Sequence, residues 1–148
     1  MTKLMLLVED NASDEKLALL AFKRCGVACE IAVARDGADA LDYVFAAGKH
    51  LGRDPTVRPA VILLDLKLPR VSGVDVLRQI RATRETRMLP VVVLTASGED
   101  ADLVRCYSLG VNAYLRKPVD FAEFLDAAKA IAMFWLRFNE PAPAVRDA

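Results

Sequence analysis

The sequence predicts an α/β fold in which a doubly wound, five-stranded parallel sheet is covered by five helices, in a flavodoxin-like arrangement. Two observations predict it. Short apolar segments alternate with amphipathic helical segments along the 148 residues, a length that suits one domain. The apolar segments are also almost free of polar residues, as in parallel strands that are buried on both faces.

Five segments are expected to form strands, because each is short, mostly apolar and followed by polar or turn-forming residues. They are Leu4–Val8, Glu30–Ala34, Ala60–Leu64, Leu89–Leu94 and Ala113–Arg116. The uncharged segments are expected at the centre of the sheet. Glu30–Ala34 and Ala113–Arg116 carry charges and are expected at its edges, which a strand order of 2-1-3-4-5 satisfies.

Capping residues predict where the helices begin and end. The expected helices are Asp14–Cys25, Asp36–Ala47, Ser72–Thr83, about Asp100–Leu109, and a long one from Asp120 to about Phe138. Asp36 and Ser72 are expected as N-caps, and Asp120 with Glu123 matches a capping box. Prolines follow the last helix, so residues 1–140 are expected to form the domain and 141–148 a frayed tail.

The composition argues against several classes of protein. Lys+Arg and Asp+Glu both number 20, which is not the basic excess of a nucleic-acid-binding or membrane-surface protein. The three cysteines lack metal-ligand spacing and suggest reduced thiols. The first apolar stretch is interrupted by Glu9-Asp10 and is too short for a signal peptide or membrane span. We therefore expect a cytoplasmic domain.

Chemically active side chains follow the predicted strands at the edge where open α/β folds place their sites. Glu9 and Asp10 follow the first strand, Asp65 the third, Thr95 the fourth and Lys117 the fifth. Two carboxylates about 4 Å apart repel by roughly 4 kcal/mol at an effective dielectric constant near 20. Lys117 offsets part of this repulsion, and oxygen ligands without His or Cys favour Mg²⁺ as the second compensating charge.

This arrangement suits phosphoryl transfer. Mg²⁺ and Lys117 would hold the oxygens of a phosphoryl group while Asp65 attacks phosphorus in line, and Thr95 would hydrogen-bond the product. Each residue alone also has an ordinary interpretation. Asp65 would be a turn former, Lys117 a surface lysine, Thr95 a capping hydroxyl, and Tyr114 a packing residue of an edge strand. The ordered combination is what favours the functional interpretation.

The combination resembles the receiver domain of two-component response regulators, from about residue 3 to residue 133. The motifs that carry the resemblance are Glu9-Asp10, Asp65 in Leu-Leu-Asp-Leu-Lys-Leu-Pro, Gly73, Thr95-Ala96, Tyr114 and Lys117-Pro118. The resemblance implies that Asp65 is the phosphoacceptor. It also implies that Asp65, Asp10 and the Lys67 backbone carbonyl bind Mg²⁺ directly, and that Glu9 acts through water.

The resemblance also implies a conformational switch. Thr95 would move onto the phosphoryl group, Tyr114 would swing inward behind it, and Lys117 would pair with the phosphate. The Lys117–Pro118 peptide is expected to be cis, a form that costs X–Pro bonds only about 0.5–1 kcal/mol.

A subgroup resemblance concerns the partner. The single-domain form, the long polar loop at 48–59 and the segment Phe134-Trp135-Leu136-Arg137-Phe138 are similar to response regulators paired with bacterial phytochrome-type histidine kinases. The resemblance implies a sensor histidine kinase of the bacteriophytochrome type as partner. No binding to nucleic acid or to a membrane, and no small-molecule substrate, is expected.

Two apolar stripes run along the final predicted helix. Residues 121, 125, 128, 132 and 135 are expected to face the sheet. The second stripe, which ends in Phe134 and Phe138, then has no internal partner. We expect a homodimer through the last strand and its flanking helices, with Phe134, Trp135 and Phe138 in the contact. In the alternative, Phe134 and Phe138 fold back onto the domain's own edge.

The function expected is that of a single-domain response regulator that lacks an output domain. It would accept a phosphoryl group onto Asp65, signal by protein binding, and catalyse only its own phosphorylation and dephosphorylation. The alternative is a Mg²⁺-dependent phosphatase with an aspartate nucleophile, but Lys67 stands where such enzymes usually place a general acid. A nucleotide- or flavin-binding domain is disfavoured, because Glu9-Asp10-Asn11 replaces a glycine-rich turn.

Overall fold

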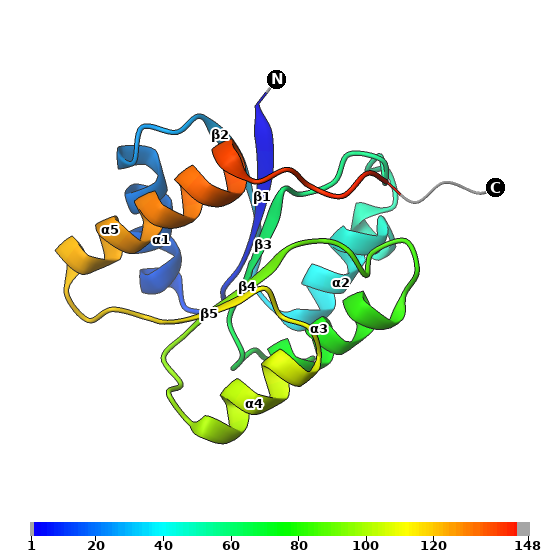
Figure 1. Ribbon diagram of the computed structural model, residues 1–148. Coiled ribbons are helices and arrows are strands. Elements are labelled where there is room, and N and C mark those ends of the chain that lie inside the picture. The colour runs from blue at the N-terminus through cyan, green and yellow to red at the C-terminus, as the bar shows by residue number, and fades with distance from the viewer. Residues whose placement is uncertain (1, 145–148) are drawn as a thin grey trace.

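The computed structural model describes residues 2–144, and its five strands form one parallel sheet in the order β2-β1-β3-β4-β5 (Figure 1). The strands are β1 (Lys3–Val8), β2 (Cys29–Ala34), β3 (Val61–Leu64), β4 (Val91–Thr95) and β5 (Ala113–Arg116). The predicted order is confirmed, and the two charged strands lie at the edges. The most apolar strands occupy the centre because burial on both faces would be costly for charged side chains.

Helices cover both faces of the sheet (Figure 1). They are α1 (Ala12–Arg24), α2 (Gly37–Phe45), α3 (Gly73–Ala82), α4 (Asp100–Ser108) and α5 (Phe121–Ile131), with a 3-10 turn η1 (Gly48–His50) and a π-helix η2 (Ala132–Phe138). The chain alternates between strand and helix, and α1 and α5 lie on the opposite face from α2, α3 and α4.

Alternation along each strand divides the core into two layers, because successive side chains point to opposite faces. Leu6 and Ile62 pack with the layer under α2 and α3, while Met5 and Leu63 pack with the layer under α1 and α5. All four side chains are fully buried. The near-continuous apolar runs of the sequence therefore supply both layers at once.

Side-chain caps set most helix starts. Asp36 accepts a hydrogen bond from the Asp39 N–H and Ser72 accepts one from the Asp75 N–H, so both predicted N-caps are confirmed. Asp120 is also an N-cap, but it accepts from the Ala122 N–H. The first helix begins at Ala12, two residues before the predicted start, because Asn11 is its N-cap.

The final helix differs from the prediction in two ways. Its α-helical part ends at Ile131, and the chain continues as the π-helix η2, where the Asn139 N–H bonds the Phe134 carbonyl five residues back. The predicted sheet-facing stripe is confirmed only in part: Ala128 and Ala132 are buried, and Leu125 and Trp135 are partly buried against the core. The buried residues are Phe124, Ala128, Ile131, Ala132 and Leu136. Of the aromatic residues in the last turns, Phe134 and Phe138 are exposed, whereas Trp135 is partly buried against the core.

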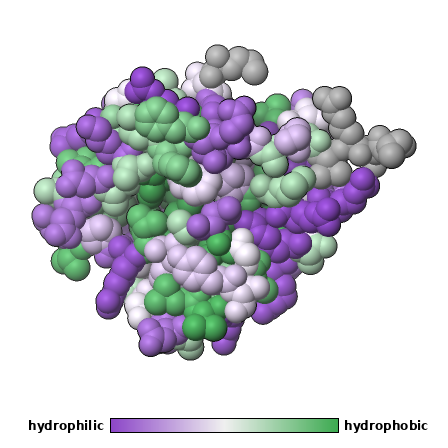
Figure 2. All heavy atoms as spheres, viewed as in Figure 1, coloured by the Kyte–Doolittle hydropathy of each residue, from purple (hydrophilic) through white to green (hydrophobic). Residues whose placement is uncertain are grey.

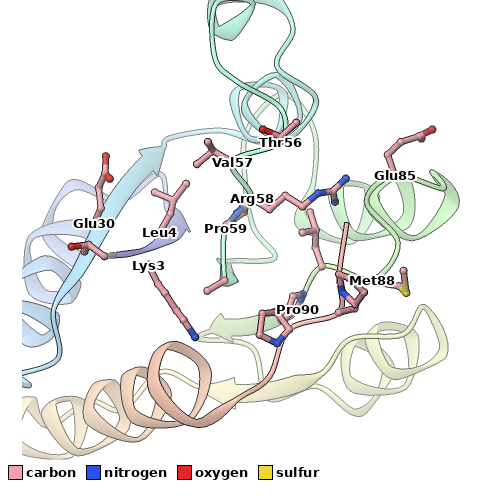
Figure 3. A pocket seen from close by; sticks show the side chains of 16 residues that line it. Lys3, Leu4, Glu30, Thr56, Val57, Arg58, Pro59, Glu85, Met88 and Pro90 are labelled. Carbon is pink, nitrogen blue, oxygen red and sulfur yellow. The ribbon is translucent and has the colours of Figure 1, made fainter. Parts of the chain in front are cut away.

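A cavity of about 480 Å³ lies at the amino end of the strands, between β1, the loop before β3 and the segment before β4 (Figure 3). Its walls are largely apolar, with the Arg58 side chain among them. Pro141, Ala142 and Pro143 of the tail that was expected to fray line one side, and the last part of that tail, 145–148, lies outside the described residues. Within 2–144, no helix is both long and apolar enough to cross a lipid bilayer.

Candidate functional site

Strand register brings the predicted site residues to one edge of the sheet. Val8 pairs with Leu64, so the residues that follow them, Glu9 and Asp65, emerge side by side. Thr95 ends β4 and is 1% exposed, while Glu9 is 4% exposed and Asp65 8%. The carboxylates and the hydroxyl are therefore held inside the edge, at the ends of strands that pack on both faces.

Lys117 joins the acidic groups. Its Nζ donates to Glu9 Oε1 at 2.5 Å, to Asp14 Oδ2 at 2.9 Å and to Asp65 Oδ2 at 3.0 Å. The side chain is only 14% exposed, so these ion pairs are well shielded from solvent. An ammonium group has three N–H donors, and each has one carboxylate partner here.

The shared ammonium affects the two buried carboxyls differently. Burial raises the pKa of Glu9 to about 7, and the negative charge of Asp65 adds to this effect against the opposing pull of Lys117. Burial also tends to raise the pKa of Asp65, but hydrogen bonds and charge from Lys117, with a bond from Thr95, hold that pKa below its ordinary value. Asp65 is thus kept ionised, as a nucleophile must be.

Lys117 itself stays charged. Burial alone would lower the pKa of its ammonium, but hydrogen bonds to Glu9, Asp14 and Asp65 raise that pKa above its ordinary value. The site therefore keeps a fixed positive charge beside the Asp65 carboxylate.

The two predicted switch residues are connected through one loop. The Thr95 hydroxyl donates to Asp65 Oδ1 at 2.9 Å, and the Tyr114 hydroxyl donates to the Ser97 carbonyl at 3.0 Å. The Ser97 hydroxyl in turn donates to Asp102 Oδ2 on α4 at 2.6 Å. The Ser97 N–H also donates to Thr95 Oγ1 at 3.4 Å, so polar contacts connect Asp65 with Tyr114 and α4.

A divalent cation fits the acidic cluster. Ligand oxygens of Glu9, Asp10 and Asp65 lie within 4.8 Å of one another. Asp10 is exposed, and its carboxylate has no hydrogen bond or ion pair to any other residue between 2 and 144. Three carboxylates with an open donor and no nitrogen or sulfur ligand match the preference of hard cations such as Mg²⁺. The Lys67 backbone carbonyl stays a predicted further ligand.

The turn after β3 explains why glycine is needed at position 73. A Cβ on Gly73 would overlap the carbonyl oxygen of Asp65, and the Gly73 N–H donates to the Leu66 carbonyl at 2.9 Å. The Lys67 N–H points back to Asp65 Oδ1 at 3.4 Å. The glycine thus lets the start of α3 approach the turn at Asp65 closely.

Two details of the site differ from the sequence analysis. The Lys117–Pro118 peptide is trans, since no peptide bond between the described residues is cis. The small energy difference between the two forms means that the Lys-Pro dipeptide does not fix the choice. Asp14 was expected only as a helix start, yet it contacts Lys117. Its position four residues after Asp10, in the first turn of a helix, was the available signal.

The aromatic residues at the chain's last helix lie away from this edge. Phe134 is 51% exposed and Phe138 66%, so they do not fold back onto the domain. Trp135 is partly buried and meets Phe134 edge to face, with ring centroids 4.8 Å apart. In the view of Figure 2, apolar groups lie over the end of the last helix and over α4, with polar groups between them.

Residues 5–129 match the response regulator receiver domain family. The chain belongs to this family. Among similar sequences, the probable methanogenesis regulatory protein FilR2 of Methanothrix harundinacea is 44% identical, over 95% of this chain and 89% of its own. Response regulator Rcp1 of Synechocystis is 35% identical, over 90% of this chain and 89% of its own.

Solved receiver structures agree with the fold. The bacteriophytochrome response regulator RtBRR is 49% identical with a TM-score of 0.77, covering 97% of this chain and 86% of its own. The phosphorylated cyanobacterial phytochrome response regulator RcpA is 34% identical with a TM-score of 0.88, covering 95% and 99%. Rcp1 in its Mn²⁺-bound form has a TM-score of 0.86 at 34% identity, covering 95% and 99%. The chain is thus a single receiver domain whose homologues include phytochrome-associated regulators.

Proposed function

We propose that this receiver domain accepts a phosphoryl group from a sensor histidine kinase onto Asp65 in a Mg²⁺-dependent reaction. One observation carries the proposal: an ionised, buried Asp65 lies between the Lys117 ammonium, the Thr95 hydroxyl and a set of carboxylates that suits a cation. The homologue RcpA is described as phosphorylated and Rcp1 as Mn²⁺-bound, which supports both parts of the proposal.

The transfer step follows from this geometry. An Asp65 carboxylate oxygen attacks the phosphorus of a phosphohistidine, a P–O bond forms, the P–N bond breaks, and its electron pair stays on the imidazole nitrogen. Lys117 and Thr95 donate hydrogen bonds to the phosphoryl oxygens. Bound Mg²⁺ would neutralise charge on those oxygens. Water then attacks the phosphorus, the P–O bond to Asp65 breaks, and inorganic phosphate leaves with the Asp65 carboxylate restored. In this proposal the protein catalyses only its own phosphorylation and dephosphorylation.

The signal would leave the site through the path from Thr95 to Ser97 and Tyr114. A phosphoryl group adds negative charge at Asp65 and new acceptors for the Thr95 hydroxyl. We expect Thr95 to move towards the phosphate and Tyr114 to move inward with the loop. The surface of α4, β5 and α5 would then change its affinity for a protein partner.

The partner kinase is proposed to be of the bacteriophytochrome type, which RtBRR and RcpA support through their described association. FilR2, which is 44% identical, is described as a probable methanogenesis regulatory protein, so the phosphotransfer assay should include kinases of other types as well.

We also propose a homodimer that buries Phe134, Trp135 and Phe138, because two of the three are more than half exposed. A cytoplasmic location is supported by the free thiols of Cys25, Cys29 and Cys106.

A phosphotransfer assay tests the proposal. The purified protein is incubated with Mg²⁺ and phosphorylated candidate kinases, and wild type is compared with Asp65→Asn. Label should pass to the wild type, be absent from the variant and be blocked by EDTA. Asp75→Asn is a matched control, because this exposed aspartate pairs with Arg78 and makes no contact with Lys117. Label on the Asp65→Asn variant would refute the assignment, and sustained turnover of a small phosphate ester would favour the phosphatase alternative.

A further inference from the structure

Asp14 is the one partner of Lys117 that lies outside the metal-binding cluster. Its Oδ2 is 2.9 Å from Lys117 Nζ, and its side chain is 37% exposed. The grouped ligand oxygens belong to Glu9, Asp10 and Asp65, and Asp14 is not among them. The contact therefore needs an explanation other than cation binding.

The first turn of α1 holds Asp14 in place. Asn11 caps the helix by accepting a hydrogen bond from the Asp14 N–H at 3.0 Å, which fixes the backbone of Asp14 in the first turn of α1. Lys117 follows the edge strand β5, and its side chain extends past the ends of β4 and β3 to Glu9, which follows β1. A flexible lysine side chain that spans this distance loses substantial rotamer freedom when it is held in one position.

The three contacts of the ammonium have different fates in phosphoryl transfer. The contact to Asp65 Oδ2 is the one that an incoming phosphoryl oxygen replaces, because the phosphoryl group is attached at Asp65. The contacts to Glu9 and Asp14 involve groups that take no part in the new bond. Two fixed acceptors therefore leave the third N–H directed at the phosphoacceptor.

We propose that Asp14 is a positioning residue, which together with Glu9 holds the Lys117 ammonium so that its remaining N–H points at the phosphoryl group on Asp65. This inference rests on the proposed phosphoryl transfer. Without Asp14, the remaining partners of the ammonium are Glu9 and Asp65, and both also belong to the candidate cation site. The ammonium then loses the fixed orientation that aids catalysis.

Glu15 provides a matched control on the same helical turn. Both acids lie in the first turn of α1 and interact in the same way with the helix dipole. Glu15 pairs with Arg35, its Oε1 lying 2.9 Å from Arg35 Nε, and makes no contact with Lys117. Asp14→Asn and Glu15→Gln therefore remove the same charge from the same turn, and only the first touches the ammonium.

The test uses two measurements on the full chain. The first is the rate of phosphoprotein formation from acetyl phosphate at saturating Mg²⁺, followed by intact mass. Asp14→Asn should lower this rate about tenfold, as expected for a misplaced group, while Glu15→Gln should change it less than about twofold. Asp14→Glu, which restores the carboxylate, should recover part of the rate.

The second measurement is independent of phosphorylation. In ¹⁵N NMR spectra without Mg²⁺ or donor, the Lys117 ammonium protons should exchange slowly in wild type and Glu15→Gln, and rapidly in Asp14→Asn. Equal behaviour of Asp14→Asn and Glu15→Gln in either measurement would overturn the positioning role. If the wild type takes up no phosphoryl group while its ammonium remains protected, the proposed function fails and the contact of Asp14 with Lys117 stands as a structural one.

Discussion

Buried charged side chains are fully paired at one end of the sheet and incompletely paired at the other. At the carboxyl end, Lys117 is enclosed by three carboxylates, and each of its donors has a partner. At the amino end, the wall of the 480 Å³ cavity includes Arg58, whose buried Nε has no hydrogen-bond partner in the described chain. Parallel strands deliver their following loops to the carboxyl end, so that end can be dense in polar groups and remain satisfied.

The comparison indicates where charge stabilises this fold. A buried ion pair that loses one member leaves an uncompensated charge, which typically costs about 3–5 kcal/mol. A buried donor without a partner already carries an unfavourable desolvation term of about 1–3 kcal/mol. Removing a charge from the two ends should therefore have effects of opposite sign.

The largest effect is expected for Lys117→Met. The free energy of unfolding at pH 7 should fall by about 3 kcal/mol, because Glu9, Asp14 and Asp65 then face one another without compensation. Phosphoryl uptake should fall steeply as well. Urea denaturation measures the first quantity. Lys49→Met is a control expected to lose less than about 1 kcal/mol, because the Lys49 side chain is 66% exposed and Asp39 keeps its contact with His50.

The same variant has a defined pH dependence. Lys117 holds the pKa of Asp65 below its ordinary value, so this stabilisation is present above the unfolded-state pKa and disappears as pH falls through the folded-state pKa. The difference in stability between wild type and Lys117→Met should therefore shrink on acidification. A difference that grows towards acidic pH would contradict the electrostatic origin of the effect.

Arg58→Met should have a smaller effect of opposite sign. Methionine keeps an apolar stem against the cavity wall and removes the unpartnered donor. The free energy of unfolding should stay equal or rise by up to about 1 kcal/mol. A loss of more than about 1 kcal/mol in urea denaturation would mean that the guanidinium group has a stabilising role, and the contrast between the two ends would be wrong.

The smallest effect on stability is expected for the double variant Phe134→Asp/Phe138→Asp. Both side chains are more than half exposed, so the monomer should lose less than about 1 kcal/mol, and the chemistry at the carboxyl end should be unchanged. If the dimer proposal is correct, sedimentation should give half the mass of the wild type. An unchanged mass with a wild type that is already monomeric would remove that proposal and leave the comparison of the two ends intact.

Several features could be predicted because they depend on local patterns. The order of the strands follows from which segments lack charge, and the N-caps Asp36, Ser72 and Asp120 follow from residue type at a helix start. Glu9 and Asp65 could be expected together because each directly follows an apolar strand. Both the alternation of strands with helices and the position of a residue at a strand end can be recognised within short segments of the sequence.

Other features required the packed structure. The face that the last helix buries was predicted only in part, because its two apolar stripes compete. Ala128 and Ala132 of the predicted stripe are buried, but so are Phe124 and Ile131 of the other stripe. The Lys117–Pro118 peptide was expected to be cis and is trans, because the two forms are close in energy and the dipeptide alone does not choose between them. In each case the local sequence allows two conformations of similar energy, and packing against the rest of the domain selects one of them.

The sequence by itself determined the parallel sheet and most of the polar side chains that meet at its carboxyl edge, because hydrophobic periodicity and strand-end position act over short stretches. The tertiary structure alone decided that Asp14 joins Glu9 and Asp65 around one ammonium, a contact between residues 103 positions apart. Such contacts depend on how α1 sits over the sheet and how far a lysine from the edge strand can reach. No local pattern encodes those distances.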